Sequence, residues 1–181
     1  MNLAKKTSEL PWHTVEKAIS KEITWLKSLI TSFGYHTSCR HCEEHAYRQL
    51  ALLIITGKIK AREIKNKKGS FWGDFLKDKD IKIFHKHGKD WHQKMMSIIN
   101  QYFSSQGFDV TTEPNLNNGR ADLGIFSLGM KDLYIEVGTV SIYKMWINLS
   151  TMKNCVFLCI PDEHTIIEFE TFHQFHPLKE K

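Results

Sequence analysis

Apolar residues recur with two different periods along this chain, and the change of period marks out its secondary structure. In residues 12–33, 43–55 and 89–105 they recur every three or four positions, which is the spacing of the buried face of a helix. After Gly107, apolar and polar positions alternate, as they do in half-buried strands. The pattern therefore predicts three amphipathic helices followed by a region of strands.

Three short strands separated by turns are expected in that region. The first covers residues 108–112, the second 120–126 and the third 133–140. Residues 117–119 (Asn-Asn-Gly) and 129–132 are turn-forming sequences that separate them. Because only a short turn joins the second strand to the third, we expect these two to pair as a hairpin.

The segments that remain predict an α/β fold. Residues 142–150 have helical spacing, and the continuous apolar run 154–160 is typical of a buried strand. For residues 58–64 and 166–172, a strand and a short helix are alternatives. We expect a mixed central sheet of about four strands flanked by helices.

Charge divides the chain into a basic and an acidic half. Residues 1–90 carry 18 Lys and Arg against 10 Asp and Glu, whereas residues 91–181 carry 7 against 10. We therefore expect a basic, mostly helical N-terminal region in residues 1–87 and an α/β core in residues 88–181. A basic surface attracts polyanions, of which nucleic acid is the commonest. The alternative is a solvated helical surface without such a partner.

The composition argues against a membrane protein or a secreted one. No apolar run approaches the ~18 residues that a membrane span needs, and the N-terminal sequence lacks the apolar segment of a signal peptide. Four cysteines in 181 residues do not form the pattern of a disulfide scaffold. We therefore expect a cytoplasmic or other intracellular protein that does not contact a membrane.

Two carboxylates fall on the two strands of the expected hairpin. Asp122 lies on one strand, and Glu136 lies among apolar residues in the middle of the next. A carboxylate inside an apolar strand is costly unless it is paired or bound to a metal ion. Two such groups on adjoining strands repel each other, and a divalent cation relieves that repulsion. The alternative for Asp122 is a turn aspartate that bonds the backbone.

The order helix, strand, strand with Asp122, strand with Glu136, helix, strand resembles the core of PD-(D/E)XK nucleases. That superfamily includes restriction endonucleases, archaeal Holliday-junction resolvases, and RecB-like and Cas4-like exonucleases. The resemblance implies a restriction-endonuclease-like core, nearest to the resolvase-like branch or to the Cas4-like and RecB-like branch. The resemblance rests on GRAD at residues 119–122 and, after a gap of 13 residues, on Glu136 in LYIEVG, and it covers residues 88–160. It implies that Asp122, Glu136 and the Val137 carbonyl bind Mg²⁺ or Mn²⁺, and that cleavage leaves a 5′-phosphate and a 3′-hydroxyl.

The chain departs from the family pattern at two positions. Gly138 stands where the motif has its lysine, and Ala121 stands where it has its proline. Some branches of the family resemble this chain in having the lysine on the following helix. We expect Lys144 to fill that role, because a long ammonium side chain can polarise the attacking water from either element. The alternative is a solvated lysine on the helix surface.

Three further residues are candidates around these carboxylates. His92 matches the position of a histidine ligand in RecB-like members, although a helix-surface or core histidine is the commoner role of such a residue. Glu113 is a candidate extra ligand or outer-shell group. Arg120 lies two residues before Asp122 and so on the same face of the expected strand, where it is a candidate contact for the scissile phosphate.

Two segments of the basic half carry their own candidate chemistry. Lysines beside an aromatic residue suit phosphate contact and base stacking, so we expect DNA contacts from the set Lys65, Lys67, Lys68 and Trp72. The alternative is a solvated loop whose aromatics turn into the core. A second set, His36, Cys39, Cys42 and His45, has spacing that can bind Zn²⁺. A redox disulfide and plain helix-entry residues are its alternatives.

The sequence therefore predicts a divalent-metal-dependent deoxyribonuclease that hydrolyses phosphodiester bonds, with branched DNA as one substrate class. Resolvases act as two-fold dimers, so in that case a homodimer is expected. One alternative is a nucleic-acid-binding protein on an inactive nuclease fold, for which Gly138 is the best support. Another is a DNA-binding regulator stabilised by zinc.

Overall fold

The computed structural model describes residues 11–30, 40–65, 88–138, 140–161 and 165–172. Within these ranges the elements, in chain order, are α2 (Trp12–Ile30), α3 (Arg40–Ile55), β1 (Ile59–Lys65), α5 (Lys89–Ser105), β2 (Asp109–Thr112), β3 (Leu123–Phe126), β4 (Asp132–Val137), α6 (Ile142–Thr151), β5 (Cys155–Ile160) and β6 (Thr165–Thr171). None of the helices in these ranges is long and apolar enough to cross a membrane.

The strands form one mixed sheet in the order β1-β6-β5-β4-β3-β2. Only β4 and β5 pair in parallel, and the other neighbours are antiparallel. The α/β class with a mixed sheet is therefore confirmed, but the sheet has six strands where about four were expected. The two additional strands are β1 and β6, the segments for which a helix had been an alternative.

Pairing between β1 and β6 explains why both segments become strands. Each alternates apolar and polar residues, and their antiparallel register aligns Ile64 with Ile166 and Arg62 with Glu168. The Arg62 guanidinium makes two hydrogen bonds to the Glu168 carboxylate, at 2.7 and 2.9 Å. A strand from the N-terminal region thus completes the sheet of the C-terminal region.

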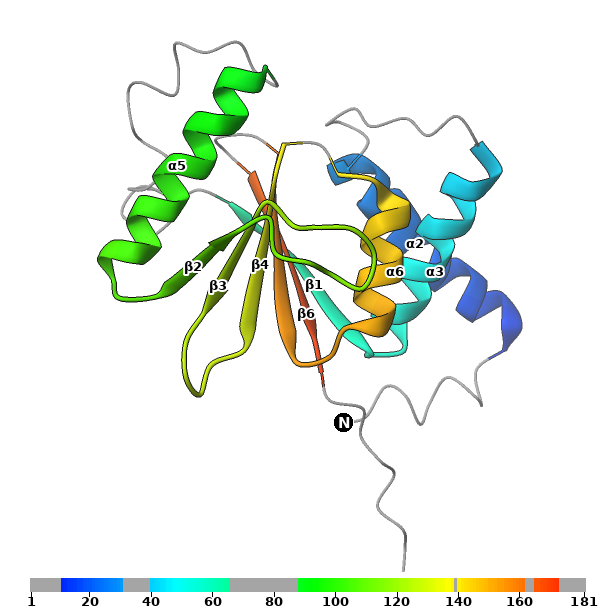
Figure 1. Ribbon diagram of the computed structural model, residues 1–181. Coiled ribbons are helices and arrows are strands. Elements are labelled where there is room, and N and C mark those ends of the chain that lie inside the picture. Colours follow the sequence, from blue (N-terminus) through cyan, green and yellow to red (C-terminus); the bar gives the residue numbers. More distant parts are fainter. Residues whose placement is uncertain (1–10, 31–39, 66–87, 139, 162–164, 173–181) are drawn as a thin grey trace, which may run out of the picture.

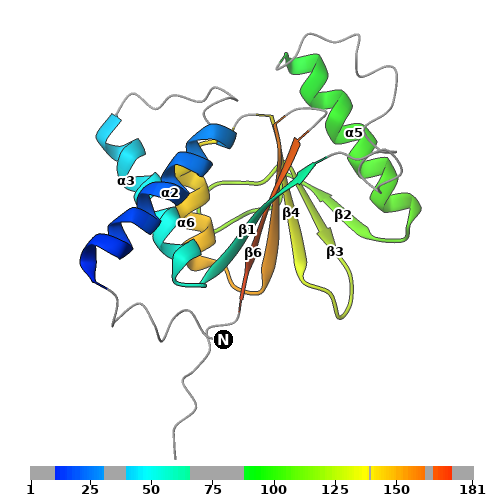
Figure 2. The same cartoon turned by 180° about the vertical axis from the view of Figure 1, so that it is seen from behind.

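Helices cover both faces of the sheet (Figure 1). Helix α5 lies on one face, and α2, α3 and α6 lie together on the other, an arrangement that the reverse view repeats (Figure 2). Alternation along the strands supplies both cores. In β4, Ile135 and Val137 pack with Trp91 of α5, whereas Tyr134 packs with the helices of the opposite face.

The second expected strand begins later than predicted and the third ends earlier, and both corrections move a candidate carboxylate. β3 begins at Leu123, so Asp122 lies just before the strand, because residues 113–122 form a loop closed by the hydrogen bond from Glu113 N to Asp122 O at 3.0 Å. β4 ends at Val137, where Gly138 turns with a φ of +80°. Glu136 is therefore near the end of β4 and not in its middle.

The α2–α3 layer is predicted to unfold together with the sheet. Leu50 is fully buried in the same cluster as Phe157 and Phe169 of the sheet. Leu50→Ala should lower the free energy of unfolding by about 2–5 kcal/mol in one urea transition, whereas Leu128→Ala, at a fully exposed turn position, should change it by less than about 0.5 kcal/mol. Two separate transitions would show that the helical layer is a unit of its own.

Candidate active site

Four of the sequence-predicted residues meet at one end of the sheet. The C-terminal end of β4 and the first turns of α5 and α6 gather there (Figure 1). His92 comes from α5, Asp122 from the loop before β3, Glu136 from β4 and Lys144 from α6. The sheet topology causes this convergence, because the parallel β4–β5 crossover places the start of α6 just beyond the end of β4.

Asp122 is held by a backbone group and by a histidine. Its Oδ2 accepts a hydrogen bond from the Val137 N–H at 2.7 Å and lies 3.2 Å from His92 Nε2. The Asp122 N–H donates in turn to Ile135 O at 3.1 Å. The alternative of a backbone-bonding aspartate is thus partly right, but the bonded backbone belongs to β4, the strand that carries Glu136.

Glu136 is buried and faces Lys144. Its Oε1 lies 2.6 Å from Lys144 Nζ, and the two side chains are 7% and 24% exposed. The short distance makes this contact a close ion pair. The Lys144 ammonium donates its hydrogen bond to the carbonyl of Arg120. Lys144 is therefore not a solvated lysine on the helix surface.

The pKa of the Glu136 carboxyl is raised from its ordinary value to about 7. Burial is the largest cause, since it removes the charged form from water. The hydrogen-bonding and charge effects of Lys144 act in the opposite direction, and the Asp122 charge adds a smaller upward contribution.

The four side chains form two pairs. Glu136 alternates with Ile135 and Val137, so it points to the α6 face of the sheet, while His92 approaches Asp122 from α5. Within the described ranges, no group of three or more His, Cys, Asp or Glu side chains is arranged to hold a metal ion. The chemistry of the donors nevertheless fits a hard divalent cation, because both carboxylates offer oxygen ligands.

The position of the missing motif lysine is occupied by a backbone turn. Gly138 has a φ of +80°, a backbone conformation that residues other than glycine rarely adopt. A Cβ built there would lie 3.6 Å from Trp91 Cζ3. The chain thus has a turn where the motif has its lysine, and the ammonium beside Glu136 comes from α6.

Glu113 and Arg120 pair with each other. Arg120 Nη1 lies 3.1 Å from Glu113 Oε2, and both side chains are more than half exposed. Glu113 adopts a positive φ of 51° in the loop. The backbone carbonyl of Arg120 accepts a hydrogen bond from Lys144 Nζ, a role that has no signature in the sequence.

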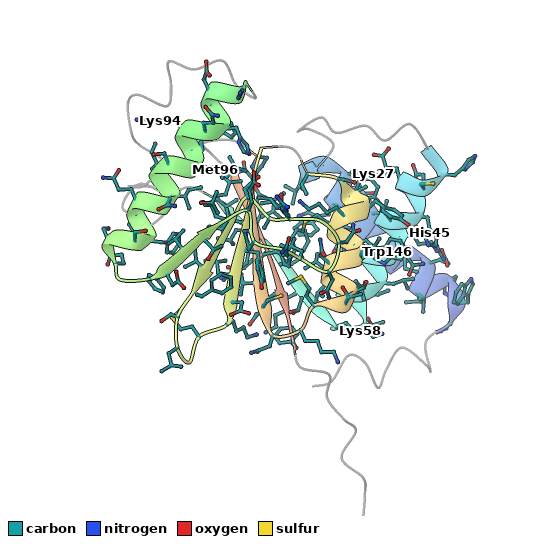
Figure 3. All side chains as sticks on the ribbon, viewed as in Figure 1. Lys27, His45, Lys58, Lys94, Met96 and Trp146 are labelled. Carbon is teal, nitrogen blue, oxygen red and sulfur yellow. The ribbon has the colours of Figure 1, made fainter. Side chains whose placement is uncertain are left out.

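The candidate DNA and zinc residues fall largely outside the described chain. Lys67, Lys68 and Trp72 lie there, as do His36 and Cys39, and of Lys65 only the backbone, paired in β1, is described. Cys42 and His45 are on the exposed side of α3. The His45 ring stands edge-on to Trp146 of α6, with centroids 5.3 Å apart (Figure 3).

An open cavity of about 450 Å³ lies between α5 and residues of β2 and β3. Its lining is mostly neutral and polar: Met96, Ser97, Asn100, Gln101, Thr112 and Leu123. Met96 lies one helical turn after His92, and Leu123 directly follows Asp122. His92 and Asp122 themselves are not among the residues that line the cavity.

Sequence reasoning missed Ser141, which caps α6 by accepting a hydrogen bond from Lys144 N at 3.5 Å. A serine directly before an apolar helical segment is a recognisable N-cap signal.

Comparison of the chain with protein-family models, curated proteins and solved structures finds no match.

Gly138 is predicted to be intolerant of a side chain. Gly138→Ala should cost about 1–2 kcal/mol of stability because of its positive φ, measured by urea unfolding. Gly138→Lys, which restores the motif lysine, should cost at least as much and should not replace Lys144. Unchanged stability in both variants would contradict the assigned backbone conformation.

Glu136 should make stability fall as pH rises. The folded carboxyl has a pKa of about 7 and the unfolded one about 4.5, so the folded state binds the extra proton between these values. We expect the free energy of unfolding to lose up to about 3 kcal/mol across this window, and Glu136→Gln to lack that loss. Asp132→Asn, at an exposed carboxylate on the same strand, is the matched control. A difference between wild type and Glu136→Gln that does not vary with pH would contradict the prediction.

Proposed function

We propose that this protein is a divalent-metal-dependent DNA endonuclease that hydrolyses phosphodiester bonds at the C-terminal end of β4. The observation that carries the proposal is the ammonium of Lys144, which lies 2.6 Å from Glu136 although the motif position itself is Gly138. A displaced lysine that returns to the buried glutamate is what the resemblance to PD-(D/E)XK nucleases requires of this sequence.

In this proposal the two carboxylates are the ligands of the metal ion, and the phosphodiester would bind against that ion. Asp122 and Glu136, with the Val137 carbonyl, would hold Mg²⁺ or Mn²⁺. Such an ion lowers the pKa of a bound water and offsets charge on the reacting phosphate. The orientation of the Asp122 carboxylate is already set for this role, because its Oδ2 contacts both the Val137 N–H and His92 Nε2.

Lys144 and His92 supply the remaining chemistry. During hydrolysis a bond forms between the water oxygen and phosphorus, and the bond from phosphorus to the leaving O3′ breaks. The Lys144 ammonium orients the attacking water and stabilises the charge that develops on the phosphoryl oxygens. His92, 3.2 Å from Asp122, holds that carboxylate toward the reacting centre.

The substrate strand is proposed to run along the cavity beside α5. Ser97, Asn100, Gln101 and Thr112 line it with neutral hydrogen-bonding groups. Such groups contact the phosphates and sugars of any sequence. The basic N-terminal half adds attraction that does not depend on base identity.

A second candidate function is binding of nucleic acid without cleavage. It is favoured by the division of the four residues into two pairs and by the ammonium beside Glu136, which already compensates the buried charge. In that case the protein has the fold and the basic surface of a nuclease without its activity. The Lys144 ammonium then takes the place of a metal ion beside Glu136.

Nicking of supercoiled plasmid DNA with Mg²⁺ or Mn²⁺ separates the two functions. Wild type should nick, Asp122→Asn and Glu136→Gln should abolish nicking, and Lys144→Met should slow it roughly 10²–10³-fold, because charge stabilisation in the transition state is lost. DNA affinity, measured in parallel with Ca²⁺, should change little in all three variants.

Two control variants match these substitutions. Asp132→Asn and Lys153→Met change exposed residues away from the site and should nick at the wild-type rate. Wild-type protein that binds DNA but does not nick it with either metal would overturn the nuclease proposal in favour of binding alone. Nicking that survives in Asp122→Asn and Glu136→Gln would place the chemistry elsewhere.

A further inference from the structure

A fully buried asparagine connects α6 to the loop that precedes β3. Asn148 has no exposed surface, and its amide is bonded on both sides to the backbone of one residue. Its Oδ1 accepts from Asn118 N at 2.9 Å, and its Nδ2 donates to Asn118 O at 3.1 Å. A buried amide that lost these partners would be costly, so this two-bond clamp fixes where the loop sits.

The clamp is the centre of a polar stripe that follows one face of α6. Lys144, Asn148 and Thr151 are spaced by four and three residues, which places them in a row on the helix. They contact successive parts of the loop: Lys144 binds the Arg120 carbonyl, Asn148 binds Asn118, and Thr151 Oγ1 accepts from Asn117 Nδ2 at 3.1 Å.

The loop in turn restrains the lysine side chain. The Arg120 carbonyl accepts a hydrogen bond from Lys144 Nζ. Gly119 has a φ of +86°, and a Cβ built on it would lie 3.7 Å from Lys144 Cε, so the turn packs directly against the lysine stem. A lysine has a flexible four-carbon stem, and these contacts select one of its many conformations.

We propose that Asn148 is a positioning residue that sets the Lys144 ammonium against Glu136 by fixing the turn at residues 117–120. The Thr151–Asn117 contact is exposed and contributes less, because water competes for its groups. The positioning itself stands on geometry alone. Its consequence for catalysis rests on the proposed nuclease function.

The ¹⁵N spectrum of lysine ammonium groups tests the positioning without any activity. In full-length wild type the Lys144 ammonium should give a slowly exchanging signal, because it is hydrogen-bonded and three-quarters buried, and Lys144→Met should identify that signal by removing it. Asn148→Leu and Asn148→Ser should broaden or remove the signal as well. Asn117→Ala, which deletes only the exposed contact of the same loop, should retain it.

A double-mutant cycle on nicking rates tests the consequence. Asn148→Leu should lower kcat roughly 10–100-fold with little change in KM for DNA. In the Lys144→Met background it should have no further effect, because a residue that acts through Lys144 has nothing left to position. A purely structural loss would add in both backgrounds.

The outcomes separate the two proposals. A Lys144 signal unchanged in folded Asn148→Leu or Asn148→Ser would overturn the positioning role, whatever the nicking assay gives. Additive losses in the cycle would overturn it too. Absence of nicking in wild type would overturn only the nuclease, and the ammonium spectrum would still decide whether Asn148 positions Lys144.

Discussion

The buried carboxylate of Glu136 is the constraint on which the rest of this site depends. Burial raises its pKa to about 7, so its charged form needs compensation from groups that the fold must bring to it. The Lys144 ammonium, 2.6 Å away, supplies that compensation from a separate helix. This ion pair ties the end of β4 to the first turn of α6.

The arrangement of the sheet makes this compensation available. Because β4 and β5 are parallel, the chain must cross over between them, and α6 is that crossover. Its first turn begins just after the left-handed turn at Gly138, and the loop before β3 lies against its polar stripe. A lysine on the first turn of α6 therefore reaches Glu136, whereas a lysine at residue 138 would require an unfavourable backbone conformation.

The candidate site was predictable only in part. The positions of α5 and β5, the antiparallel pairing of β3 with β4 and the involvement of Lys144 follow from periodicity and from the resemblance to a known motif. The Arg120 carbonyl and the Asn148 clamp do not. A backbone carbonyl has no sequence signature, and a buried asparagine on a helix is indistinguishable from an exposed one until its neighbours are known.

The sequence by itself determined the local structure: where apolar positions recur with helical or strand periods, and which residues carry charge. Those properties depend on near neighbours in the chain. Only the tertiary structure decided that β1 and β6 are strands, since each pairs with the other, and that the four candidate residues form two pairs, His92 with Asp122 and Glu136 with Lys144. Such contacts join residues far apart in sequence, and their energies exist only once the sheet has assembled.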